Sequence, residues 1–393
     1  MIKDSLSESP SNSSDEAKHH DEGQLASSEE LLEVFHSTFS PRQQEEIVYA
    51  FGYGSGVFAQ TDSSKNDEAE QSATEQKMLD MIIIVQDALQ FHSINIEENP
   101  HHYAPLFRTP SRAAWWQTHQ APFPWLLSNP KVFFNFCQDP LLLKYGIMER
   151  QHLCSDLQFW DSLYIAGRMQ KPTATILQSS SSSDDGLMML QDYQNRYNLP
   201  AALSTALLLL GRQDDTDATT EIPLSALYSQ ISSLSYTGDF RMQVGAEDPA
   251  KIDKLVHSPG QLQRFHQMYH ATALQPLVES GVVSLETNSN IGDTAAAAAA
   301  TTITWNPQDP STIAELRQRL PPRLARHLEP KSQSSSSHAT TTTTTRLLQN
   351  ELHSIVAPAA RYQAFKGLWT AGITKSASYA LAKLSKGLLR SWR

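Results

Sequence analysis

Residues 49–60 read Y-A-F-G-Y-G-S-G-V-F-A-Q, and a polar segment separates them from M-L-D-M-I-I-I-V at 78–85. Gly54, Ser55 and Gly56 directly follow an apolar run, so the backbone can turn tightly there and present amide N–H groups to an anion. Asp80 heads the second apolar run, where its carboxylate could hold a magnesium ion against a triphosphate. The two features predict a metal-dependent nucleotide site, and the plainer alternative is a structural turn beside a capping aspartate.

Composition restricts the classes of protein that this chain can belong to. Its 393 residues suffice for two domains, and no window has the roughly 18 apolar residues of a membrane span. The two cysteines, Cys137 and Cys154, disfavour a disulfide framework and fit a reducing compartment. The net charge of -11 argues against nucleic acid as a partner, although residues 361–393 carry seven Lys or Arg and no acid.

The order of patterns predicts an α+β fold. Apolar runs at 47–51, 81–85, 132–136 and 141–147 read as strands, the last two joined at Asp139-Pro140. Helical patterns begin at Ser28 and recur at 153–160, 199–210 and 222–234. We expect a mixed-sheet domain at 29–178, a mainly helical domain at 187–330 and a basic tail at 346–393.

Several segments have too few apolar residues to predict a packed structure. Residues 1–28 are Ser-rich and acidic, so we expect them to be disordered, and they show no signal peptide or Arg-rich presequence. The polar stretch at 61–75 reads as a surface loop. Serine, alanine and threonine runs at 179–183, 295–300, 334–337 and 340–345 are expected to form mobile loops without chemistry of their own.

Further motifs follow the opening stretch in a fixed order along the chain. They read F-H-S-I-N, N-P-H-H-Y, K-Y-G, L-Y-I-A-G-R-M-Q-K-P and L-S-Y-T-G-D-F-R-M, within residues 91–242. Together with G-Y-G-S-G-V-F and D-M-I-I-I-V, they resemble the mitochondrial phosphatidate cytidylyltransferase family, also called the mitochondrial translocator assembly and maintenance proteins. Several blocks in one order are far more specific than a lone G-S-G.

The resemblance implies a fold, a reaction and a location. It implies a nucleotidyltransferase-like domain followed by a winged-helix-like domain. It also implies a magnesium-dependent enzyme that joins CTP to phosphatidic acid, giving CDP-diacylglycerol for cardiolipin and phosphatidylglycerol synthesis. The implied location is the matrix face of the inner mitochondrial membrane, as a peripheral protein. The sequence leaves the oligomeric state open.

We expect twelve residues to form the site, and Ser55 has two of the roles. The residues expected to carry the chemistry are Ser55, Asp80, Lys144, Lys171, Asp239 and Arg241. Those expected to bind or order the nucleotide are Tyr53, Gly54, Ser55, Gly56, His92, Asn95 and Arg168. Cations are needed because charge on the phosphates must be neutralised during nucleotidyl transfer, whereas no general base is needed, since the attacking phosphate is already an anion. For each cation the alternative is a solvated surface charge.

The metal ligands are expected to be Asp80 and Asp239. Nucleotidyltransferases usually carry two acids spaced D-x-D on one strand, but here Ile82 stands at the second position. Asp87 lies past the strand, so we prefer Asp239 as the second ligand. His92, His101 and His102 have poor spacing for zinc, with no H-x3-H pair and no cysteine near them in the sequence.

The C-terminal segment carries the last functional signal. Apolar residues from Phe365 to Trp392 recur at helical spacings among four cations at Lys375, Lys383, Lys386 and Arg390. Such a basic amphipathic helix suits an anionic bilayer, and the alternative is a helix docked on the protein itself. Two other functions stay open: a nucleotidyltransferase with a different acceptor, and a non-catalytic assembly factor for mitochondrial import.

Overall fold

The computed structural model describes most of the chain between Ser28 and Thr370. The described ranges are 28–58, 78–121, 123, 126–137, 142–178, 185–211, 219–243, 250–287, 300–328 and 337–370. The predictions for residues 1–27, the loop at 61–75, the runs at 179–183, 295–299 and 334–336, and the tail from 371 onward fall outside these ranges.

A five-stranded mixed sheet forms the centre of the first half. Its strands lie in the order β3-β4-β2-β1-β5, with β2 parallel to β4 and the other pairs antiparallel. The strands are β1 (Ile47–Tyr53), β2 (Leu79–Val85), β3 (Phe133–Cys137), β4 (Leu143–Glu149) and β5 (Ala174–Gln178). The four predicted strands are confirmed to within two residues at their ends. The central β2 is apolar on both faces, as expected of a strand covered on both sides.

Helices cover both faces of this sheet. The face that carries Ile83 and Tyr145 packs against Phe35 of α1 (Ser28–Thr38) and Phe91 of α3 (Ala88–Glu98). The face that carries Ile82 packs with α5 (Arg150–Phe159), α6 (Ala166–Met169) and the second half of the chain. Because successive strand residues point to opposite faces, Asp80 lies on the Ile82 face.

Short elements connect the strands of the first half. They are α2 (Pro41–Gln44), η1 (Pro100–His102), η2 (Pro105–Phe107) and α4 (Pro110–Thr118). The helix predicted at 153–160 is confirmed as α5, which begins three residues earlier. It ends where Trp160 adopts a left-handed backbone conformation with φ of 54°.

The second half is mainly helical with a small antiparallel sheet, ordered β6-β8-β7. Its helices are α7 (Asp185–Tyr193), η3 (Gln194–Asn198), α8 (Leu199–Leu210), α9 (Leu224–Leu234), α10 (Phe240–Gln243), α11 (Lys251–His257), α12 (Gln261–Tyr269), η4 (His270–Leu274), α13 (Gln275–Glu279), α15 (Pro310–Gln318), α16 (Pro322–Ala325) and η5 (Arg326–Leu328). Its strands are β6 (Thr220–Pro223), β7 (Val283–Thr287) and β8 (Thr301–Trp305). The predicted helix at 222–234 starts too early, since β6 runs to Pro223 and the helix begins at Leu224. The α+β class is confirmed, whereas the domain boundaries stay predictions.

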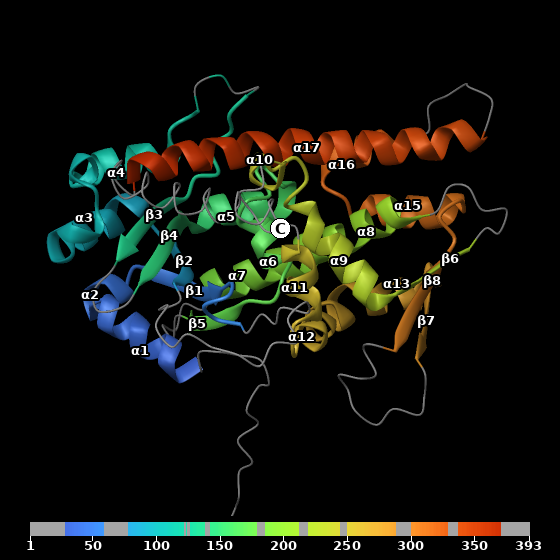
Figure 1. Ribbon diagram of the computed structural model, residues 1–393, viewed down its shortest axis with the longest axis horizontal. Coiled ribbons are helices and arrows are strands. Elements are labelled where there is room, and N and C mark those ends of the chain that lie inside the picture. The colour runs from blue at the N-terminus through green and yellow to red at the C-terminus, as the bar shows by residue number, and fades with distance from the viewer. Residues whose placement is uncertain are drawn as a thin grey trace, which may run out of the picture.

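A long helix, α17 (Ser337–Thr370), runs along one side of the molecule and spans both halves (Figure 1). The expectation of a loop at 340–345 is wrong, because these threonines lie within α17. Helix propagation is cooperative, and the segment that follows is held on the protein by buried Leu348, Leu352 and Ile355. The described part of the predicted tail, up to Thr370, is therefore a docked helix. Among the described helices, none combines the length and apolarity needed to cross a membrane.

Candidate active site

The glycine-rich turn and Asp80 meet at one edge of the sheet. Tyr53 ends β1 and pairs with Asp80 on β2, and Gly54 follows with φ of 82°. The amides of Val57 and Phe58 both donate to the Gly54 carbonyl, which closes the turn with Ser55 exposed at its tip. Gly56 passes so close to the Met78 carbonyl that a Cβ there would lie 2.3 Å from it. The local sequence thus holds the turn against the start of β2.

Lys144 lies beside Asp80 because β2 and β4 are parallel and in register at these two residues. The Lys144 Nζ is 3.5 Å from Asp80 Oδ1, and it also lies over the Phe134 ring. The Tyr53 hydroxyl donates to the same carboxylate oxygen at 3.3 Å. These contacts are long, and both charged side chains remain partly exposed, so the carboxylate stays accessible to a cation or a phosphate-bound metal.

Arg168 connects this edge of the sheet to the second half. Its guanidinium carbon stacks 3.9 Å from the centroid of the Tyr53 ring. The loop before it is organised by Asp156, whose buried carboxylate accepts from the amides of Ser162, Leu163 and Ala166 at 2.8 to 3.0 Å. Burial raises the pKa of Asp156, and these hydrogen bonds oppose the rise. A carboxylate thus fixes the start of α6, on which Arg168 is placed.

A pocket opens between the two halves, next to Arg168. The residues that line it come from the segment 162–171, from the segment 235–241 and from α17: Ser162, Leu163, Tyr164, Arg168, Lys171, Ser235, Tyr236, Asp239, Arg241, Val356 and Ala360. The two loops approach closely at Gly167, where a Cβ would lie 2.3 Å from the Ser235 Cβ. Both halves of the chain therefore contribute residues to the pocket.

Lys171 is the most deeply buried cation of the pocket. Its Nζ donates to Ser235 Oγ at 2.7 Å and lies 4.4 Å from the centroid of the Tyr236 ring. Burial lowers the pKa of Lys171 well below its ordinary value, and the nearby Arg168 and Lys251 lower it further. An anion bound in the pocket would favour the charged form of this lysine.

Sequence comparison shows to which family the chain belongs. A model of the family described as mitochondrial phosphatidate cytidylyltransferase matches residues 37–386. The chain belongs to that family. Relatives named mitochondrial phosphatidate cytidylyltransferase include one from Dictyostelium discoideum, 31% identical over 86% of this chain and 81% of that protein. A Schizosaccharomyces pombe relative is 31% identical over 89% and 82%, and one from Danio rerio 29% over 92% and 96%.

The solved structures offer a weaker comparison for this member of the phosphatidate cytidylyltransferase family. The crystal structure of a nucleotidyltransferase-like protein from Exiguobacterium sibiricum aligns with a TM-score of 0.22 and 10% identity. The alignment covers 85% of this chain and 78% of that chain. The family assignment rests on the sequence matches.

Asp239 does not fit the metal-ligand role that the sequence suggested for this family member. Its side chain is 2% exposed, and Arg241 holds both carboxylate oxygens, with Nη2 2.6 Å from Oδ2 and Nε 3.0 Å from Oδ1. A carboxylate already engaged by a guanidinium fork has little capacity left for a cation. The pair instead aims Arg241 into the pocket, while Asp80 keeps accessible oxygens.

His92 and Asn95 lie away from the pocket, which corrects their predicted nucleotide role. Both are on α3, on the opposite face of the sheet from Asp80, and both are fully buried. The His92 Nε2–H donates to Gln117 and its Nδ1 accepts from the Tyr103 hydroxyl. Burial lowers the pKa of His92 to about 4, so the ring is neutral. These side chains form a buried hydrogen-bond network.

In the same network a cysteine lies close to two histidines from which the sequence separates it. His101, His102 and Cys137 bring one donor atom each within 4.8 Å of one another, although Cys137 is 35 residues from His102. Asn95 and Asn135 both donate to the Tyr145 hydroxyl, so its own O–H donates to His102 Nδ1. The proton of neutral His102 then sits on Nε2, toward the Cys137 sulfur. A protonated nitrogen makes this a hydrogen bond within the core.

Sequence reasoning missed several residues that shape the pocket. Asp156, Ser235 and Tyr236 stand within or beside recognised motifs, but their roles depend on contacts with distant segments. Val356 and Ala360 were taken as part of a tail, yet α17 brings them to the pocket wall. Asp156 gave a usable signal, since it precedes the L-Y-I-A-G-R-M motif in a helix-to-loop position.

Proposed function

We propose that this protein transfers the cytidylyl group of CTP to phosphatidic acid, giving CDP-diacylglycerol and pyrophosphate. The observation that carries the proposal is the meeting of the 54–56 turn, Asp80 and Lys144 at one edge of the sheet, in a chain of the phosphatidate cytidylyltransferase family. A phosphate oxygen of phosphatidic acid attacks the α-phosphorus of CTP. A new P–O bond forms at the α-phosphorus. The bond between the α-phosphorus and the oxygen that bridges it to the β-phosphate breaks, and pyrophosphate leaves.

Asp80 is the side chain best suited to hold magnesium. Its contacts with Tyr53 and Lys144 are longer than 3.2 Å, and Gly54 leaves open backbone beside its Oδ2. Magnesium usually takes only one or two carboxylates and completes its octahedron with substrate phosphates and water, so a second protein acid is not obligatory. The ion would neutralise triphosphate charge as pyrophosphate departs. A second acid at the position of Ile82, which is buried in the core, would therefore not be required.

The remaining site residues bind and orient the two phosphate groups. The 54–56 turn supports the triphosphate through backbone amides and the exposed Ser55 hydroxyl. Lys144 and Arg168 neutralise charge on the sheet side, whereas Lys171 and Arg241 do so on the pocket side. Burial and the Asp80 carboxylate raise the pKa of Tyr53, so its hydroxyl stays protonated and continues to donate to Asp80.

The proposal extends to where the enzyme works. Phosphatidic acid is presented by a bilayer, and residues 371–393 carry five Lys or Arg and no acid. We propose a peripheral enzyme of the mitochondrial inner membrane, on its matrix face, that supplies CDP-diacylglycerol for cardiolipin and phosphatidylglycerol. Anionic lipid attracts such a basic segment, and the acidic bulk of the chain disfavours nucleic acid.

The test uses purified full-length protein, labelled CTP, magnesium and vesicles containing phosphatidic acid. We expect labelled CDP-diacylglycerol, lost in Asp80→Asn and retained in Asp192→Asn. Asp192 is an exposed aspartate of α7 whose carboxylate pairs with Arg196. CTP turnover without a lipid product would point to another acceptor. CTP binding without any turnover, across several divalent metals, would overturn the proposal and favour the assembly-factor function.

A further inference from the structure

Exposed apolar side chains gather where α4 meets the C-terminal end of α17. Trp115 is 58% exposed and Leu368 is 51% exposed, and Phe365 and Trp369 are also exposed. Phe123 and Leu126, in the segment after α4, are exposed as well. In Figure 1, α4 lies beside the end of α17 that is formed by its last residues. Contiguous exposed apolar surface of this kind marks a binding face more often than chance.

Ring contacts link the aromatic residues of α4 to those of α17, and Leu368 lies one helical turn after Phe365. Trp115 stacks on His119 at 4.2 Å between centroids, and the Tyr362 hydroxyl bonds to the same histidine. Phe365 lies 6.3 Å from both Trp116 and Trp369. We call Trp115, Trp116, His119, Phe365, Leu368 and Trp369 the aromatic platform, and the buried Tyr362 lies beneath it.

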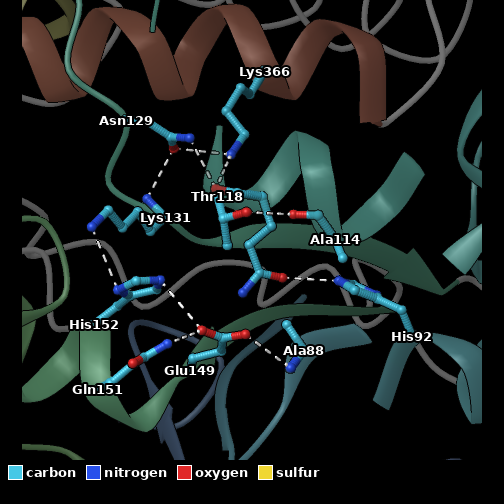
Figure 2. A network of polar contacts seen from close by, with 11 residues as sticks. Ala88, His92, Ala114, Thr118, Asn129, Lys131, Glu149, Gln151, His152 and Lys366 are labelled. Atoms are coloured by element: carbon cyan, nitrogen blue, oxygen red, sulfur yellow. Dashed lines mark hydrogen bonds and ion pairs between the residues drawn. The ribbon is translucent and has the colours of Figure 1, made fainter. Parts of the chain in front are cut away.

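The platform is held rigidly by polar contacts beneath it. Figure 2 shows Lys366 reaching from α17 toward Asn129 in the first half of the chain. The buried Lys366 Nζ donates to Asn129 Oδ1 and to the backbone carbonyls of Gln117 and Val132, at 3.1 to 3.3 Å. The Ser128 amide also donates to the Pro358 carbonyl. The two halves of the platform are therefore fixed relative to each other before any partner binds.

Charge identifies the partner. The chain has 42 Asp and Glu, yet neither residues 99–138 nor residues 352–393 contain one, and these two segments supply the whole platform. The last described residue, Thr370, leaves the platform directly into the basic segment 371–393. An apolar aromatic surface flanked by cations and free of acids matches the interface of an anionic bilayer.

We infer that the aromatic platform is the surface that seats the protein on an anionic, phosphatidate-bearing bilayer, an inference that rests on the proposed function for its choice of lipid. The platform and the pocket share α17. Val356 lines the pocket and Phe365 belongs to the platform, and nine helical residues span about 14 Å. Seating the platform therefore places the pocket within reach of lipid headgroups.

Vesicle flotation of the full chain tests the inference. The protein is mixed with vesicles of phosphatidylcholine and phosphatidic acid, without CTP. The Trp115→Ser/Leu368→Ser double variant should bind more weakly, by about tenfold for each side chain withdrawn from the bilayer. The matched control is Met188→Ser/Met189→Ser, which removes two exposed apolar side chains from α7 and should float like the unmodified chain. Unchanged melting temperatures exclude misfolding.

Two results would overturn the inference. The first is a platform variant that floats like the unmodified chain. The second is a dimer in sedimentation that the platform variant converts to monomer, with no vesicle binding by either.

A second substrate separates this inference from the proposed function. On short-chain phosphatidic acid dispersed as monomers, the platform variant should turn over as fast as the unmodified chain, and only its activity on vesicles should fall. If no form of the protein makes CDP-diacylglycerol but flotation still depends on Trp115 and Leu368, the docking surface stands and the proposed function fails.

Discussion

Both faces of the central sheet carry polar side chains, but the two groups differ in their hydrogen bonds and exposure. On the Asp80 face, Asp80 and Lys144 are partly exposed and make contacts of 3.3 to 3.5 Å. On the α3 face, His92, Asn95 and Tyr145 are buried and joined by bonds of 2.8 to 2.9 Å. Polar groups with room and long contacts can take a ligand, whereas fully paired ones stabilise the fold.

Among these variants, exchange of Asp80 for asparagine should have the largest effect on activity. Asp80→Asn keeps the shape of the side chain but removes the charge that attracts the metal, so we expect kcat/KM for CTP to fall by about 10³-fold. The melting temperature should change little, because Asp80 makes only long contacts. Activity and calorimetry on the same preparation check both statements. A large loss of stability would show that Asp80 stabilises the fold and is not kept free for a metal.

The contrast also shows what the sequence could predict. The strands, the 54–56 turn and its position beside Asp80 follow from apolar runs and glycines that lie close together along the chain. The motif F-H-S-I-N looked equally functional, yet α3 directs His92 and Asn95 into the core on the other face. A motif does not state toward which side of a sheet its helix points. That depends on packing with Phe35 and Tyr145, which lie far away in the sequence.

Distant contacts limited the prediction of the site in a second way. The choice of Asp239 as a ligand rested on its type and its motif, and nothing local showed that Arg241 would occupy both of its oxygens. The helix expected from Phe365 onward is confirmed only as far as Thr370. The described part of the predicted tail carries a buried lysine and two residues of the pocket wall. Only the partner surface could have revealed that burial.

Lys171 should make CTP binding depend on pH. Burial, with Arg168 and Lys251, lowers its pKa, so it loses its proton at a lower pH than an ordinary lysine. CTP binding should therefore weaken as pH rises through that lowered pKa, and Lys171→Arg should keep binding at higher pH because arginine stays charged. Lys171→Met should cost about 10²-fold in kcat/KM at neutral pH. Equal pH profiles for the unmodified chain and Lys171→Arg would contradict this role.

Asn95 should stabilise the fold without taking part in catalysis. Its amide donates to Tyr103 and Tyr145, and its oxygen accepts from Gln43 and Asn99. Asn95→Ala leaves buried groups without partners, so we expect unfolding free energy to fall by about 2–3 kcal/mol. The activity of the protein that remains folded should be unchanged. Urea unfolding and kcat measured below the unfolding transition check this, and a fall in kcat at unchanged stability would return Asn95 to the active site.

Lys366 is a buried cation outside the pocket. Its exchange should give the smallest effect, a change in how the unfolding free energy depends on pH. Burial lowers its pKa to about 7, whereas an unfolded lysine titrates near about 10.4. Between these values the unfolded chain binds more protons than the folded chain, so this group makes stability rise with pH from about 7 to about 10. Below pH 7 the folded chain keeps the proton and the full cost of burying it. Lys366→Met removes the titration, so the slope of unfolding free energy against pH should fall by under about 1.4 kcal/mol per pH unit. Urea unfolding at pH 7 and pH 9 measures that slope, and equal slopes in the two proteins would show that Lys366 holds α17 without titrating in this range.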